Sequence, residues 1–127
     1  MGTKAFITLK DWLEGRAQAI RTLESKAEKV LHDDQDQNKY RQIMLEKATL
    51  LANLAEEAAP LVSHLPEHER GTVSDRLSRF SQSASVAKRI GSVFYMSALL
   101  YPEDHKPGEK NDLETFIDSV KVLAEGE

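Results

Sequence analysis

Apolar residues recur at steps of three and four along most of this chain, and this spacing constrains the fold more than any other feature of the sequence. Residues three and four apart share one face of an α-helix, whereas a half-buried strand needs an apolar residue at every second position. No segment shows a convincing period of two, and the few prolines and glycines cluster at a small number of places. The sequence therefore predicts an all-α protein.

The breaks in this spacing predict three long helices and one shorter C-terminal helix. Thr8 is a plausible N-cap for the first helix, and the Asp residues of the turn at 32–36 can cap the second. Pro60 predicts a kink or an early end in the second helix. Asn111 and Glu114 resemble a capping box at the start of the last helix. The predicted helical ranges are 8–31, 40–65, 66–101 and 111–124.

Short connections between these helices predict antiparallel neighbours, so the expected architecture is an up-and-down helical bundle. The length of 127 residues fits one domain, which we place at 1–127. Arg16 and Lys47 interrupt the apolar rows of the first two helices. Each is interpreted as a cation at the bundle edge or paired with a facing acid, as a determinant of helix register or partner choice, or as a buried ligand-binding cation.

Composition and charge exclude several classes of protein. The chain has no cysteine, so disulfides, thiolate metal sites and cysteine nucleophiles are excluded. A net charge of -4 argues against a general nucleic-acid binder. The longest apolar-rich stretch, 90–101, has 12 residues, whereas a membrane span needs about 20. The N-terminus lacks the apolar core of a signal peptide. We therefore expect a soluble cytoplasmic protein with no membrane contact.

The motifs of common enzyme sites are absent. No Glu-x-x-His pair, phosphate-binding glycine loop or Gly-x-Ser-x-Gly elbow occurs in the sequence. The expectation is a protein with no catalytic residues, no cofactor and no metal. Glu24, Glu28 and His32 would share one helix face, but we interpret them as an exposed charged face. His64 and His68 flank a proline turn and are likewise interpreted as exposed turn residues.

Positive charge is concentrated in one part of the chain. Residues 70–101 contain five basic residues and one acidic residue, which gives this segment a charge of +4 and leaves -8 for the rest. At about 100° per residue, these cations spread over the helix surface and do not form one stripe. We therefore interpret them as complementing the acidic helices within the molecule.

The end of the third predicted helix carries more apolar residues than one face needs, since 9 of the 12 residues at 90–101 are apolar. Its main row is expected to face the core and includes Gly91 and Phe94. A second row lies about 130° around the same helix on ideal geometry. Because a surface helix normally has one apolar face, this second row is expected to be covered either within the monomer or by another chain. Few other helices are available to cover it, so we favour a homodimer interface. The row consists of Val86, Ile90, Val93, Ser97 and Leu100.

These features predict a non-catalytic helical-bundle module for protein–protein interaction that self-associates. The alternative is a carrier or sensor of small ligands with a pocket between helices, near Gly91 and the small residues of the third helix. In that case Tyr40, Tyr95 and Tyr101 would supply the polar contacts.

Overall fold

The structure is a computed structural model that describes residues 3–125. Every regular element within this range is helical, so the predicted all-α bundle is confirmed, although the number of helices is larger than predicted. The elements are α1 (Thr3–Lys29), the π-helix η1 (Val30–Asp34), α2 (Gln37–Ala52), α3 (Leu54–Val62), α4 (Glu67–Ile90), α5 (Val93–Ala98) and α6 (Asp112–Glu125). No helix in this range is long and apolar enough to cross a membrane.

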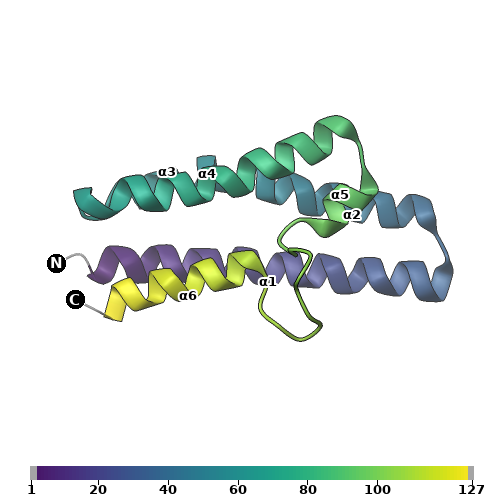
Figure 1. Ribbon diagram of the computed structural model, residues 1–127, viewed down its shortest axis with the longest axis horizontal. Coiled ribbons are helices and arrows are strands. Elements are labelled where there is room, and N and C mark those ends of the chain that lie inside the picture. Colours follow the sequence, from purple (N-terminus) through teal and green to yellow (C-terminus); the bar gives the residue numbers. More distant parts are fainter. Residues whose placement is uncertain (1–2, 126–127) are drawn as a thin grey trace.

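The long helices lie side by side and form an elongated bundle (Figure 1). The helix α1 packs against α2 and α6, while α4 packs against α2 and α3. In Figure 1, α1 and α4 run in one direction, and α2, α3 and α6 run in the other. The start of α1 and the end of α6 lie at the same end of the bundle. The short helix α5 lies at the far end of α4 and contacts α2.

The first helix starts earlier than the sequence predicted, because Thr8 does not cap it. The Thr8 Oγ1 hydroxyl lies inside α1 and donates a hydrogen bond to the Lys4 carbonyl oxygen at 3.0 Å. Within a helix, a threonine hydroxyl can donate its hydrogen bond to the backbone carbonyl four residues earlier in this way. The prediction of an Asp cap for the next helix is confirmed, since the Asp36 carboxylate accepts a hydrogen bond from the Lys39 N–H at 3.0 Å.

The second predicted helix is divided at Asn53, and Pro60 lies inside α3. The Ser81 hydroxyl of α4 inserts at this division. It accepts a hydrogen bond from the Ala55 N–H and donates one to the Leu51 carbonyl, each at 2.9 Å. These two groups are four residues apart and would bond to each other in an unbroken helix. The inserted hydroxyl therefore explains the position of the break.

The third predicted helix ends about ten residues early, so the prediction of one helix over 66–101 is wrong. Gly91 ends α4 in the left-handed conformation, with φ of 73°, and its N–H bonds the Ala87 carbonyl oxygen. Ser92 then begins α5, because its hydroxyl accepts a hydrogen bond from the Tyr95 N–H at 3.1 Å. A left-handed glycine followed by a serine N-cap ends one helix and starts another.

The predicted capping box of the last helix is confirmed. The Glu114 N–H donates to the Asn111 side-chain oxygen, and the Asn111 N–H donates to the Glu114 carboxylate, each at 2.9 Å. Two N–H groups that the helix itself cannot satisfy are bonded in this way. The box fixes the start of α6 after the long connection that follows α5.

The buried apolar residues form two clusters along the bundle. The larger cluster joins α1, α3, α6 and most of α4. The smaller cluster lies at the other end, where Met96 of α5 covers residues of α1, η1, α2 and α4. The predicted rows supply most of both clusters. The members of the smaller cluster are Ala27, Val30, Ile43, Met44, Ala48, Ala87 and Met96.

We predict that replacing Ser81 with alanine destabilises the fold by about 1–3 kcal/mol, because it leaves the Leu51 carbonyl and the Ala55 N–H without their partner. Ser85→Ala is the matched control, since Ser85 is an exposed serine of the same helix. Its unfolding free energy should change by no more than about 0.5 kcal/mol. Urea denaturation of the two variants measures the difference. Equal free energies for both would show that the inserted hydroxyl is unimportant.

Candidate functional site

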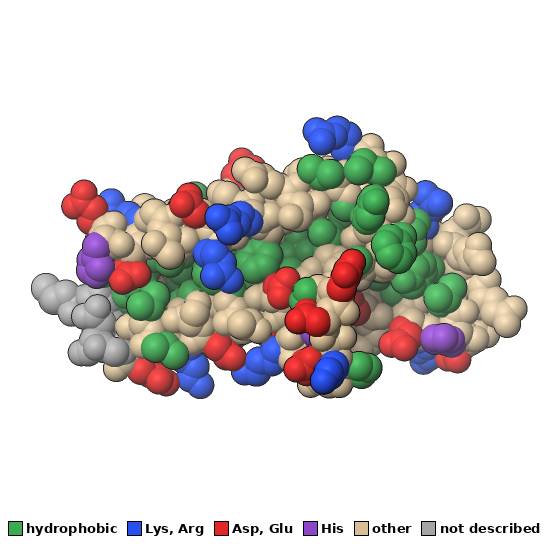
Figure 2. Space-filling view, viewed as in Figure 1, with side chains coloured by type: hydrophobic (Ala, Val, Ile, Leu, Met, Phe, Trp, Pro, Cys, Tyr) green, Lys and Arg blue, Asp and Glu red, His purple; other side chains and the backbone are tan. Residues whose placement is uncertain are grey.

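An exposed apolar surface covers the corner between the end of α4 and α5, and we call it the α4–α5 surface. Figure 2 shows it as a gathering of hydrophobic side chains on the right-hand part of the face. It is unusual because its aromatic members are half to three-quarters exposed. The exposed fractions are 41% for Val86, 58% for Ile90, 74% for Phe94 and 53% for Tyr95.

A groove of about 670 Å³ adjoins this surface, and we call it the α4–α5 groove. One wall comes from the last turns of α4, the other comes from α5 and the residues that follow it, and Asp112 of α6 also lines the groove. Its lining is mainly apolar. The lining residues are Gln82, Ser83, Val86, Ala87, Ile90, Tyr95, Ala98, Leu99, Leu100, Tyr101, Pro102 and Asp112.

The structure divides the row predicted as an interface, because that row required one helix from Val86 to Leu100. Val86 and Ile90 are exposed on α4 and line the groove. Leu100 also lines it but is only 7% exposed. Val93 and Ser97 are half-buried and face elsewhere, with Val93 packed on the smaller core cluster. The continuous row is therefore wrong, and only part of it contributes to the groove.

Two exposed aromatic members of the surface, Phe94 and Tyr95, are absent from the predicted interface. The apolar spacing places Phe94 in the core-facing row, but the side chain is 74% exposed. The helix break at Gly91 changes the direction of the chain, so residues after it leave the row that precedes it. The dipeptide Gly91-Ser92 carried the signal for this break, because glycine favours a helix C-terminus and serine an N-cap.

A buried lysine holds α5 in place behind this surface. Lys47 of α2 is 0% exposed, and its ammonium lies 2.9 Å from the Glu24 carboxylate of α1. The same ammonium donates a hydrogen bond to the Ser97 carbonyl oxygen of α5 at 3.0 Å. The interpretation of Lys47 as paired with a facing acid is thereby confirmed. We call Lys47, Glu24 and the Ser97 carbonyl the clasp.

Tyr101 extends the clasp toward α6. Its hydroxyl donates to the Glu24 carboxylate at 2.6 Å and accepts from the Arg21 guanidinium at 3.1 Å. Arg21 also forms two hydrogen bonds with the Glu114 carboxylate, at 2.6 and 3.0 Å. The polar groups of α1, α2, α5 and α6 therefore meet at one point of the bundle.

Burial in this cluster shifts the acid–base equilibria of its members. Burial of the Lys47 ammonium lowers its pKa, an effect that the neighbouring Glu24 carboxylate opposes. The pKa of Tyr101 rises to about 12, first because burial disfavours the phenolate and then because the phenol donates to Glu24. The pKa of Glu114 is lowered mainly by its hydrogen bonds with Arg21. The folded state therefore favours a neutral Tyr101 and an ionised Glu114.

The weaker metal-binding patterns of the sequence are not assembled into sites. Glu24 is directed to Lys47 and Tyr101, while Glu28 and His32 are exposed, with 3.9 Å between their nearest side-chain atoms. Within 3–125, no three His, Asp or Glu side chains are grouped as metal ligands. The other interrupting cation, Arg16, is partly exposed, lies over the Trp12 ring and approaches Glu57 to 3.9 Å.

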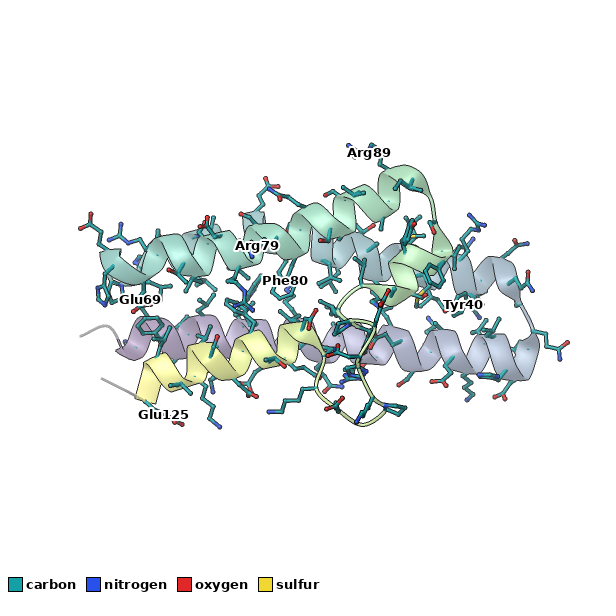
Figure 3. The ribbon with its side chains drawn as sticks, in the orientation of Figure 1. Tyr40, Glu69, Arg79, Phe80, Arg89 and Glu125 are labelled. Atoms are coloured by element: carbon teal, nitrogen blue, oxygen red, sulfur yellow. The ribbon has the colours of Figure 1, made fainter. Side chains whose placement is uncertain are left out.

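Charges of opposite sign border the α4–α5 surface on its two sides. In Figure 2, Lys and Arg side chains lie above it and to its left, and acidic side chains lie below it. Arg89 marks the upper border, where it projects from the end of α4 (Figure 3). Asp112, at the start of α6, is the acidic residue that lines the groove. The surface is thus an apolar centre between a basic border and an acidic border.

Comparison with known proteins gives no match to a family model, a curated protein or a solved structure.

We predict that Tyr101 makes the protein sensitive to alkali between pH 10.0 and about 12. The unfolded chain ionises this phenol near its ordinary value, while the folded chain resists ionisation up to its raised pKa. The stability that Tyr101 contributes is therefore complete below pH 10.0 and is lost as the pH rises toward 12. The advantage of wild type over Tyr101→Phe in unfolding free energy should shrink across this interval. A constant difference would contradict the burial of the phenol.

Proposed function

We propose that this protein is a non-catalytic, cytoplasmic protein–protein interaction module that forms a homodimer through the α4–α5 surface. The exposure of Phe94, at 74%, is the observation that carries the proposal. Large exposed apolar patches are uncommon on monomers and mark interaction sites. An apolar centre with a charged border is also the usual composition of a protein interface, in which aromatic residues are enriched.

The arrangement of charge supports a second copy of the chain as the partner. In a two-fold dimer, the same surface of each copy meets the other. A two-fold axis parallel to α4 and running along the groove sets the basic border of each copy against the acidic border of the other. An axis across the groove would instead set like charges together. The surface is therefore complementary to itself in one orientation.

The exposed apolar side chains project from α4 and α5, and the α4–α5 groove lies between these two helices. In the proposed dimer, the exposed Phe94 ring of one copy packs on the α4 wall of the other copy's groove, where Val86 and Ile90 are exposed. The contact would then extend beyond the four exposed residues to the groove walls and both charged borders. This extension matters because a stable pair buries about 800 Å² on each partner. Phe94 is the expected energetic centre, because buried aromatic residues dominate most interfaces.

A small-ligand carrier is the second candidate, favoured by the volume of the groove. At about 670 Å³ the groove has the size of common ligand sites. Tyr95 and Tyr101 both line it and would supply polar contacts, as the alternative proposal requires. A ligand at 100 times its dissociation constant would raise the unfolding free energy of the monomer by about 2.7 kcal/mol. Self-association alone gives no such response to a metabolite panel.

We predict that wild type is a dimer at micromolar concentration and that Phe94→Asp and Ile90→Lys each convert it to a monomer. Both changes place a charge at the centre of the apolar contact, where it loses water on association. Light scattering across a concentration series measures the mass. Because both side chains are exposed in the single chain, the melting temperature of the dissociated form should change little.

The matched control for this experiment is Val122→Asp, since Val122 is 64% exposed on α6 and belongs to neither the surface nor the groove. It should remain dimeric. A monomeric wild type would refute self-association. A dimer that survives both surface changes, or one that Val122→Asp dissociates, would show that the interface lies elsewhere.

A further inference from the structure

The segment 92–99 is bounded by two residues with left-handed backbone. Gly91 precedes it with φ of 73°, and Leu100 follows it with φ of 78°. Glycine adopts this conformation freely, but a bulky leucine does so only where its surroundings impose it. Leu100 is 7% exposed, and its carbonyl accepts a hydrogen bond from the Asp112 N–H at 2.9 Å. The strain at Leu100 is therefore held by contacts with the rest of the fold.

The helix within this segment cannot maintain its own position. With six residues, α5 is far too short to be stable alone, because helix nucleation is unfavourable. It is held by contacts with α2 and α4. Met96 is inserted into the smaller core cluster, and the Ser97 carbonyl accepts the hydrogen bond from Lys47. A single buried ammonium is thus the main polar attachment of α5.

Two hollows flank the segment. On the side of α4 lies the α4–α5 groove of about 670 Å³, which Tyr95 and Ala98 line. On the side of α1 and α2 lies a second hollow of about 420 Å³, which Ser97 lines together with Lys47. Both hollows are open at the surface, so this short segment borders solvent on two sides.

We propose that residues 92–99 form a movable strap, that Gly91 and Leu100 are its hinges, and that the clasp of Lys47 with Glu24 holds it in place. Release of the clasp lets the strap leave the smaller core cluster while the long helices stay folded. This inference rests on the proposed function in one respect. Because the strap carries Phe94 and Tyr95, its position determines whether the interaction surface exists.

Lys47→Met tests the strap, because methionine has a similar length and no charge. Loss of a charge-assisted hydrogen bond predicts about 10- to 100-fold faster amide hydrogen exchange at 92–101, with exchange in the middle of α1 and α4 unchanged. Arg16→Met is the matched control, since Arg16 also interrupts an apolar row but is partly exposed. It should leave exchange at 92–101 as in wild type. Two results for Lys47→Met would overturn the strap proposal. One is unchanged exchange at 92–101, and the other is exchange that is faster in all helices equally.

Tyr101→Phe is a milder second variant if Lys47→Met does not fold. It removes the hydrogen bonds of the Tyr101 hydroxyl with Glu24 and with Arg21 and leaves the Lys47 contacts in place. The expected result is a smaller increase in exchange, confined to the same residues, and no increase there would overturn the proposal.

Light scattering of the same variants separates the two proposals. Faster exchange at 92–101 together with weaker dimerisation supports both. Faster exchange with unchanged dimerisation supports the strap and contradicts the α4–α5 surface as the interface.

Discussion

A fully buried lysine is the constraint around which the far end of this bundle is arranged. An ammonium removed from water destabilises a fold by several kcal/mol unless partners replace its hydration. Lys47 obtains those partners from Glu24 of α1 and from the Ser97 carbonyl of α5. Glu24 in turn accepts from Tyr101, which is linked through Arg21 to the start of α6. A residue that looks like an interruption of an apolar row therefore connects four helices.

Because of this attachment, the two ends of the bundle are expected to differ in local stability. The larger apolar cluster packs long helices against one another over several turns. The smaller cluster is completed by one short helix that depends on the clasp. Local stability follows the number of buried apolar contacts, so the end that carries α5 is the part expected to open first. The proposed interaction surface lies on this end.

Much of the fold could be predicted from apolar spacing and capping residues. The rows of α1 and α2 are buried as expected, and the capping box of α6 and the Asp36 cap are present. The division at Asn53 could not be predicted, because it depends on the Ser81 hydroxyl, which is distant in sequence. The end of α4 could have been predicted from Gly91-Ser92. The apolar spacing across that dipeptide favoured a continuous helix, and this error misplaced Phe94.

The candidate site was predicted only in part for the same reason. The segment near Ile90 has more apolar residues than one buried helix face needs, and some of them are exposed. This number can be counted from the sequence without knowing where the helix breaks. The division of that surface between α4 and α5 depends on backbone direction after Gly91 and on the contacts of Lys47. The backbone direction and the lysine contacts both depend on tertiary structure, which helical periodicity does not predict.

Pairing of the α4–α5 surface with its own copy is tested most directly by exchanging the charges of its two borders. Arg89→Glu makes the basic border acidic, and Asp112→Lys makes the acidic border basic. Each variant alone should dimerise more weakly than wild type at low salt, because like charges then meet twice. An equimolar mixture should form a heterodimer of near wild-type affinity, measured by light scattering and native mass spectrometry, because opposite charges meet again. A mixture that associates no better than its separate components would contradict the two-fold arrangement.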